Sequence, residues 1–206
     1  MSDKGFEIYT VERITEADFG CEETGRSEPY ALLCLKALSE NAMPEKYVEL
    51  SESFIAKQGI AEGKKVCISE AGEVNRYIRV VAAVIIDESD GVKKVFATAR
   101  GYGAYKGWWE FPGGKIEAGE TPREALVREI AEELTARIEA GELLKTIEYD
   151  YPEFHLSMDC FMAKVVSGVL ELKEAESARW LTEDTIDSVR WLPADLELIA
   201  SVKAKL

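Results

Sequence analysis

The stretch that decides the fold is GGKIEAGETPREALVREIAEEL, which occupies residues 113–134. Its middle predicts the first turn of a helix. Thr121 can cap this helix, Pro122 is favoured in the first turn, and Glu124 completes a capping box with Thr121. Four apolar residues then recur with helical periodicity: Ala125, Leu126, Ile130 and Leu134. The segment is therefore expected to form an amphipathic helix that follows a glycine-rich loop.

Three glutamates lie on one face of the expected helix. Glu129, Glu132 and Glu133 are spaced i, i+3 and i+4, and like charges at this spacing cost roughly 0.2–0.5 kcal/mol per pair. One interpretation is a solvated helix face, because glutamate is a good helix former. The other is a cation site, because Mg²⁺ prefers oxygen ligands and bridges carboxylates to substrate phosphates. Arg128 can orient one of the glutamates, and Gly114 allows close approach of the backbone.

The fixed positions of this stretch resemble the signature of the Nudix hydrolases. That signature is a glycine, five residues, a glutamate, seven residues, Arg-Glu, an aliphatic residue, any residue, Glu-Glu, any residue, a glycine and an aliphatic residue. Here these positions fall on Gly114, Glu120, Arg128, Glu129, Ile130, Glu132, Glu133, Thr135 and Ala136. Every charged position matches, and the wider string WEFPGGKIEAGETP is similar to that of the MutT-type nucleoside triphosphate pyrophosphohydrolases.

One position departs from the signature. Thr135 stands where the signature has its last glycine. A helix often ends on a residue with positive φ, which glycine adopts easily and a β-branched residue does not. The helix is therefore expected either to continue slightly or to end without that cap. No metal ligand is lost by this change.

The resemblance runs from about Tyr77 to the C-terminus and implies a Nudix-type α+β fold, in which helices sandwich a mixed β-sheet. We expect residues 77–206 to form this domain. Strand-like runs occur at 78–86, 94–100, 143–151, 154–166 and 179–181. A final amphipathic helix is expected from Pro193, with an apolar side made of Leu196, Ile199, Ala200 and Val202. Residues 1–75 show short alternating runs that predict a small β-rich module of unknown role, with a helix capped by Ser51.

The resemblance also implies a divalent metal cofactor, Mg²⁺ with Mn²⁺ as the alternative. The implied ligands in the signature are the carbonyl of Gly114 and the carboxylates of Glu129, Glu132 and Glu133. The family uses a further acidic residue after the central sheet. Glu174 fits this place by its distance ahead of Trp180, and Glu176 is the rival. For either residue the alternative is an exposed loop acid.

In the implied mechanism a carboxylate, with Glu129 favoured, deprotonates or orients a water molecule. The water attacks phosphorus within a diphosphate bridge, so a nucleoside triphosphate yields the monophosphate and pyrophosphate. Arg128 stands beside Glu129 in the sequence, and Glu120 is expected to be structural through a pair with Arg128.

Substrate contacts are implied for four residues. Arg100 ends the second strand of the domain, where MutT-type enzymes carry a phosphate- or base-contacting arginine, and Lys115 could touch phosphate. Phe111 or the pair 108–109 could stack on a base, or could instead pack a strand edge. Asp195 falls where relatives place a base-binding Asn or Asp. Because a carboxylate only accepts hydrogen bonds, cytosine, adenine and oxidised guanine all remain open.

Three functions follow from these residues. The first is hydrolysis of a nucleoside triphosphate, either a modified dNTP such as 8-oxo-dGTP or a substrate of the CTP/dCTP type. The second is hydrolysis of another nucleoside diphosphate-X such as ADP-ribose. The third is a non-catalytic module that senses nucleotides, which the complete set of motif acids disfavours.

Composition limits the partners and the location. A formal net charge of −14 argues against a sequence-independent binder of nucleic-acid polymers. Apolar runs fall short of the ~18 residues of a membrane span, and the N-terminus lacks the pattern of a signal peptide. We therefore expect a cytoplasmic protein with a small nucleotide as its partner and no membrane contact, and we leave a homodimer open. His155, the single histidine, is expected to be structural in its strand-like context.

Overall fold

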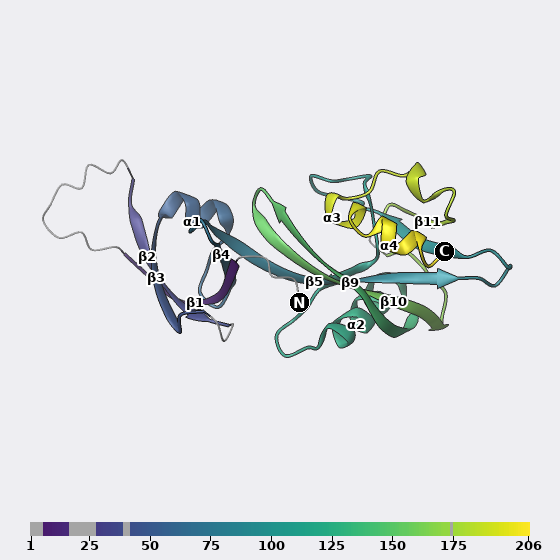
Figure 1. Ribbon diagram of the computed structural model, residues 1–206, viewed down its shortest axis with the longest axis horizontal. Coiled ribbons are helices and arrows are strands. Elements are labelled where there is room, and N and C mark those ends of the chain that lie inside the picture. The colour runs from purple at the N-terminus through teal and green to yellow at the C-terminus, as the bar shows by residue number, and fades with distance from the viewer. Residues whose placement is uncertain (1–5, 17–27, 39–41, 174) are drawn as a thin grey trace, which may run out of the picture. The chain divides into compact units, whose positions relative to one another are not determined.

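A computed structural model describes residues 6–16, 28–38, 42–173 and 175–206 (Figure 1). The chain divides into two compact units. The first comprises Met1–Ile78 and Asp150–Leu156, and the second comprises Arg79–Tyr149 and Ser157–Leu206. Within the described ranges, no helix combines the length and the apolar character needed to cross a membrane.

The first unit is built on an antiparallel sheet with the strand order β4-β1-β2-β3. Its elements are β1 (Phe6–Glu16), β2 (Tyr30–Ala37), β3 (Glu45–Ser51), α1 (Glu52–Gln58) and β4 (Lys65–Ser69). The hydroxyl of Ser51 accepts a hydrogen bond from the N–H of Phe54, and α1 ends at Gly59 with a φ of 62°. This is the Ser51 cap that the sequence predicts, and the glycine supplies the left-handed residue that closes the helix.

The second unit is a mixed β-sheet with its helices in separate segments. β6 lies between β5 and β11, β7 pairs with β6, β8 pairs with β5, and β10 pairs with both β5 and β9. The strands are β5 (Val74–Asp87), β6 (Lys94–Ala99), β7 (Trp109–Glu110), β8 (Gly113–Lys115), β9 (Arg137–Tyr151), β10 (Phe154–Ser167) and β11 (Ser177–Leu181). The helices are α2 (Pro122–Leu134), the 3₁₀ turn η1 (Ile186–Ser188), α3 (Pro193–Leu196) and α4 (Ile199–Lys203). Figure 1 shows α2 on one side of β9, and α3 and α4 on the other.

The tip of the β9–β10 hairpin belongs to the first unit. His155 at this tip is 3% exposed. Its ring centroid lies 4.4 Å from that of Phe6, and the ring stacks on Tyr77. Its Nδ1 also pairs with the carboxylate of Asp150. His155 therefore has the structural role that its context predicts, although its partners in the N-terminal strands cannot be read from the local pattern.

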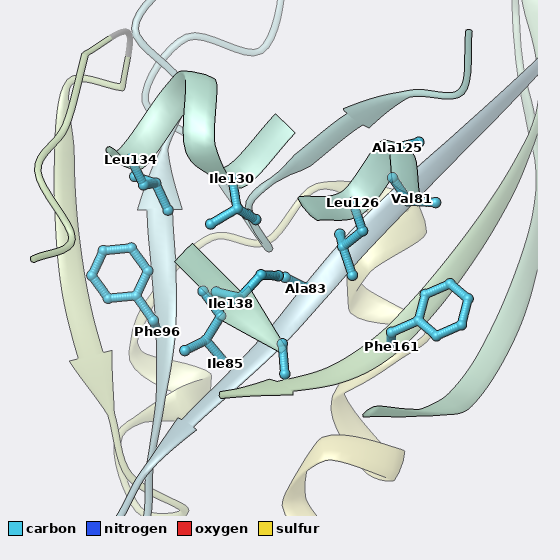
Figure 2. Close-up of a cluster of buried hydrophobic side chains, with 11 residues drawn as sticks. Val81, Ala83, Ile85, Phe96, Ala125, Leu126, Ile130, Leu134, Ile138 and Phe161 are labelled. Carbon is cyan, nitrogen blue, oxygen red and sulfur yellow. The ribbon is translucent and has the colours of Figure 1, made fainter. Parts of the chain in front are cut away.

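An apolar cluster fixes α2 against the sheet (Figure 2). Leu126, Ile130 and Leu134 of α2 are at most 1% exposed and pack with side chains of β5 and with Phe96 of β6. Full burial of each such side chain contributes about 1.5–3 kcal/mol. The predicted apolar side of this helix is thus confirmed, and its polar face is held at a defined place beside β8.

The expected C-terminal helix is instead two short helices. The N–H of Leu198 donates to the carbonyl of Asp195, three residues earlier, at 2.9 Å. This tighter turn between α3 and α4 shifts the helical phase. Leu198 is therefore fully buried while Leu196 is 60% exposed. Ile199 and Val202 are buried as predicted, whereas the positions of Leu196 and Ala200 on the apolar side were predicted wrongly.

The C-terminus of α2 differs from both sequence-based alternatives. The helix ends at Thr135, which adopts the left-handed conformation with a φ of 53°. Among the described residues it is the sole non-glycine residue with positive φ. The Thr135 hydroxyl donates to the carbonyl of Val169 at 3.3 Å. The backbone therefore keeps the glycine-type cap without a glycine, at a cost of roughly 1–2 kcal/mol.

Replacement of Thr135 tests this strain. Thr135→Gly removes the steric penalty, whereas Thr135→Val keeps the β-branch and removes only the hydroxyl. We expect the free energy of unfolding of the glycine variant to exceed that of the valine variant by about 1 kcal/mol, after the entropic cost of glycine in the unfolded chain. Urea denaturation of both variants measures the difference. Equal stability would show that the left-handed threonine is not strained.

Candidate active site

The start of α2 is fixed by reciprocal hydrogen bonds. The Thr121 hydroxyl accepts from the N–H of Glu124 at 3.3 Å, and the Glu124 carboxylate accepts from the N–H of Thr121 at 2.9 Å. The capping box predicted from the sequence is therefore confirmed. Upstream, Gly114 of β8 lies opposite Val81 of β5. These two constraints, the cap and the strand pairing, bring the glycines of β8 beside the glutamates of α2.

Arg128 is the centre of the charged cluster on α2. Its Nε and Nη2 donate to the two carboxylate oxygens of Glu120 at 2.7 and 2.9 Å. Its Nη1 donates to Glu129 at 2.9 Å and to Glu132 at 3.3 Å. Its Nη2 also donates to the carbonyl of Lys115 at 3.0 Å. One guanidinium thus holds three carboxylates and the end of β8 together, and includes the Glu120 pair that the family resemblance implies.

These hydrogen bonds shift the ionisation of both partners. The hydrogen bonds from Arg128 and from the N–H of Glu117 lower the pKa of Glu120 to about 2. The hydrogen bonds to Glu120 and Glu129, against the opposing effect of burial, raise the pKa of Arg128. Glu120 therefore stays ionised, and its pair with Arg128 stays intact, across the whole range of neutral and mildly acidic pH.

Gly114 makes room for the carboxylate of Glu129. A Cβ atom at Gly114 would lie 2.3 Å from the carboxyl carbon of Glu129 and 2.4 Å from one of its oxygens. A larger residue at position 114 would push the Glu129 carboxylate out of this position. The Glu129 side chain is 15% exposed, so it is enclosed between β8 and Arg128 while one edge still reaches solvent.

The remaining predicted ligands occupy different positions. Glu132 is exposed on α2 with a side chain that is 62% accessible. Glu133 is half-buried and lines a pocket with Arg100 and Gly113. Glu176 is exposed, and its N–H donates to the carbonyl of Ala99. Glu174 lies outside the described residues.

The chemistry of this donor set fits a hard divalent cation. The donors are carboxylate and carbonyl oxygens, which such ions prefer, and Gly114 preserves a space that a Cβ would fill. Among the described residues, no three acidic, histidine or cysteine side chains converge closely enough to hold an ion. The Arg128 guanidinium contacts both Glu129 and Glu132. Glu132 is 62% exposed, so it can rotate towards Glu129 without loss of core packing.

A pocket of about 70 Å³ opens between β6, β7 and the end of α2. Arg100 lies at its edge and makes a two-pronged ion pair with Glu110, with Nε and Nη2 at 3.1 and 2.7 Å from the carboxylate oxygens. Burial lowers the pKa of Arg100, but the hydrogen bonds and charge of Glu110 outweigh this, and the net shift of the pKa is upward. Glu110 is not among the site residues predicted from the sequence. Glu110 is placed by the register of β7 on β6, in which it pairs with Thr98. The sequence alone does not specify this register.

Phe111 and Asp195 are parts of the core next to this pocket. Phe111 is 4% exposed and stacks on Trp191, with ring centroids 4.7 Å apart. The ring therefore packs the strand edge, which is the alternative to base stacking. Asp195 is 4% exposed, and its Oδ1 accepts from the N–H of Phe111 at 2.8 Å.

The buried carboxyl group of Asp195 differs from the acceptor assumed from the sequence. Burial raises its pKa to about 8, although the hydrogen bond from Phe111 opposes the shift. At neutral pH the group is therefore mostly protonated, with one oxygen already used by Phe111. The sequence-based prediction for Asp195 assumed an ionised carboxylate, whereas burial favours the protonated form.

The glycine strand and the acid-rich helix lie in the part of the chain that matches the Nudix hydrolases, which act on phosphoric anhydride bonds. The chain belongs to the Nudix family, because the NUDIX domain model matches residues 76–204. The α+β fold and the family predicted from the sequence are thereby confirmed.

Individual relatives and one solved structure agree with this membership. The chain is 30% identical over 129 residues to an 8-oxo-dGTP diphosphatase of Escherichia coli, covering 62% of this chain and 98% of the relative. It is 31% identical over 129 residues to a CTP pyrophosphohydrolase of the same organism, covering 63% and 93%. The solution structure of the E. coli ORF135 protein superposes with a TM-score of 0.54 at 28% identity, covering 63% of this chain and 91% of that chain.

Gly114→Ala tests the contact with Glu129. The added Cβ overlaps the carboxylate, while the backbone of Gly114 needs no left-handed conformation. We expect the rate of nucleotide hydrolysis to fall roughly 100-fold, since a displacement of about 1 Å at a reacting group has that effect. Gly119→Ala is the control, because nothing lies within 4 Å of its Cβ although its φ is 88°. It should lose stability but keep its rate. Full activity of Gly114→Ala would show that hydrolysis does not depend on the position of the Glu129 carboxylate.

Asp195→Asn tests the buried carboxyl group. The native pKa of about 8 lies above the reference value of 3.8, so between these values the native state holds a proton that the unfolded state has released. Stability contributed by Asp195 is complete below about pH 4 and declines as pH rises towards 8, by roughly 1.4 kcal/mol per pH unit. Asparagine has no such titration. The stability of Asp195→Asn relative to wild type should therefore rise between pH 5 and pH 8 in denaturant titrations. Exposed Asp184→Asn is the control, and a parallel curve for Asp195→Asn would refute the shifted pKa.

Proposed function

We propose that this chain hydrolyses a nucleoside triphosphate to the nucleoside monophosphate and pyrophosphate, with Mg²⁺ or Mn²⁺ as cofactor. The observation that carries the proposal is the enclosure of the Glu129 carboxylate between Gly114 and Arg128. A Cβ at position 114 would displace this carboxylate, so the glycine permits the enclosed position of Glu129. Two relatives support the substrate class by name, an 8-oxo-dGTP diphosphatase and a CTP pyrophosphohydrolase.

The residues of α2 divide the work between positioning and proton transfer. Glu120 holds Arg128 through two hydrogen bonds, and Arg128 in turn orients Glu129. A divalent ion, when bound by Glu129, Glu132, Glu133 and the Gly114 carbonyl, would supply charge neutralisation at the substrate phosphates. Glu129 accepts a proton from the attacking water. The water oxygen forms a bond to phosphorus as the bridging P–O bond breaks, and pyrophosphate leaves.

The substrate is a small nucleotide, and we infer a modified dNTP such as 8-oxo-dGTP or a CTP/dCTP-type triphosphate. Arg100 and Lys115 are proposed to contact its phosphates, and Glu174 to be the distal metal ligand. For Arg100 the ion pair with Glu110 sets the direction of the guanidinium at the pocket edge. We place the reaction in the cytoplasm.

A screen for pyrophosphate release tests the proposal. The substrates are the canonical dNTPs and NTPs, 8-oxo-dGTP and ADP-ribose, each with Mg²⁺, with Mn²⁺ and with EDTA. We expect metal-dependent turnover of at least one triphosphate. ADP-ribose releases no pyrophosphate, so its hydrolysis is followed by chromatography of AMP and ribose 5-phosphate. Those products from ADP-ribose alone would select the diphosphate-X alternative, and no turnover on any compound would select a sensing module.

Glu132→Gln tests the metal-ligand role within the same assay. Glu132 is exposed and its contact with Arg128 is 3.3 Å long, so its loss should change stability by less than about 1 kcal/mol. We expect kcat to fall roughly 100-fold or more, since the carboxylate charge acts at the phosphates. Glu183→Gln, an exposed glutamate in the turn after β11, serves as the matched control. Unchanged kcat in Glu132→Gln would remove Glu132 from the metal site.

A further inference from the structure

The aromatic side chains that the sequence offers for base stacking already have partners. Phe111 stacks on Trp191. The guanidinium of Arg179 lies 5.2 Å from the centroid of Trp109, and that of Arg190 lies 3.6 Å from the centroid of Trp108. Each of these rings therefore has a face covered by another part of the same chain. A nucleobase stacks on an aromatic ring through a face that it can reach.

Tyr102 provides such a face at the pocket. It is 65% exposed, and among the described residues that line the pocket it is the sole aromatic one. Arg100, Glu110 and Glu133 line the same pocket. Tyr102 therefore lies on the rim of a cavity that also contains one of the proposed metal-ligating acids.

The loop that carries Tyr102 is closed by backbone hydrogen bonds. The N–H of Arg100 donates to the carbonyl of Trp108 at 2.9 Å, and the N–H of Gly107 donates to the carbonyl of Arg100 at 2.8 Å. Gly103 and Gly107 have φ values of 78° and 80°, which glycine adopts without steric cost. The loop thus has a fixed neck, which keeps the backbone of Tyr102 beside the pocket.

The size of the pocket separates the phosphate and base positions. Pockets that enclose a ligand of nucleotide size usually measure about 300–1,000 Å³, whereas this one encloses about 70 Å³. It can therefore take a compact polar group but not a whole nucleotide. With the polar groups of a substrate at Glu133 and Arg100, the base has to lie at the rim, where Tyr102 is.

We propose that Tyr102 stacks on the nucleobase of the substrate and favours purines over pyrimidines. This inference rests on the proposed function for the identity of the ligand as a nucleotide. A purine presents two fused rings to the phenol face and a pyrimidine only one, so a stacking contact at the rim discriminates by ring area. It needs no hydrogen-bond partner specific to one base and tolerates an altered purine such as an oxidised guanine.

Tyr102→Ala measures the stacking contribution. We expect KM for dGTP to rise about 5- to 150-fold, which corresponds to the loss of one base–aromatic stack. KM for dCTP should rise less, and KM for abasic deoxyribose 5-triphosphate and kcat should stay unchanged. Tyr102→Phe should behave as wild type because it keeps the ring. Tyr47→Ala, which removes a 56% exposed tyrosine of the first unit, is the matched control. An unchanged KM for dGTP, or an equal rise for the abasic compound, would overturn the proposal.

Product binding separates this inference from the proposed function. Calorimetric titration with dGMP and dCMP in the presence of Mg²⁺ reports stacking whether or not turnover occurs. Weaker dGMP binding by Tyr102→Ala without wild-type turnover would refute the hydrolytic function and keep the stacking role. Turnover by the wild type together with equal dGMP binding in both proteins would keep the hydrolytic function and refute the stacking role of Tyr102. A wild-type protein that neither turns over nucleotides nor binds dGMP would overturn both.

Discussion

The guanidinium of Arg128 is the interaction on which the site depends. It forms ion pairs with Glu120, Glu129 and Glu132 and so offsets part of the negative charge that would otherwise weaken α2. It also donates to the carbonyl of Lys115, which attaches the end of β8 to the helix. The same hydrogen bonds that satisfy the acids therefore set the distance between the glycine strand and the glutamate face. The ion pairs and the geometry of the site therefore depend on the same side chain.

The apolar and charged sides of α2 explain why one stretch of sequence predicts so much of the fold. The same helix is specified by its capping box, its proline, its apolar periodicity and the spacing of its acids. The apolar cluster around Ile130 then orients the helix on the sheet. Local patterns of this kind depend on neighbours a few residues apart. For that reason the capping box, the buried helix side and the glutamate face could be predicted, whereas the break between α3 and α4 depends on tertiary packing of Leu198 and could not.

Other parts of the site depend on pairings between distant segments. The register of β7 on β6 brings Glu110 into an ion pair with Arg100. Asp195 accepts a hydrogen bond from the N–H of Phe111, which is distant in the sequence. Neither the ion pair nor the protonated carboxyl group follows from residue type, because burial and register decide them. Thr135 shows the opposite case. The sequence marks it as unusual, but only the backbone shows that the turn keeps the conformation of the missing glycine.

The hairpin tip at Asp150–Leu156 bears on how this chain can be divided. Its His155 is buried by Phe6 and Tyr77, so the first compact unit is assembled from two separate stretches of sequence. A boundary drawn as a single cut in the chain therefore cannot release either unit intact. A transplant of the N-terminal segment onto another protein would therefore have to carry the hairpin residues 150–156 with it.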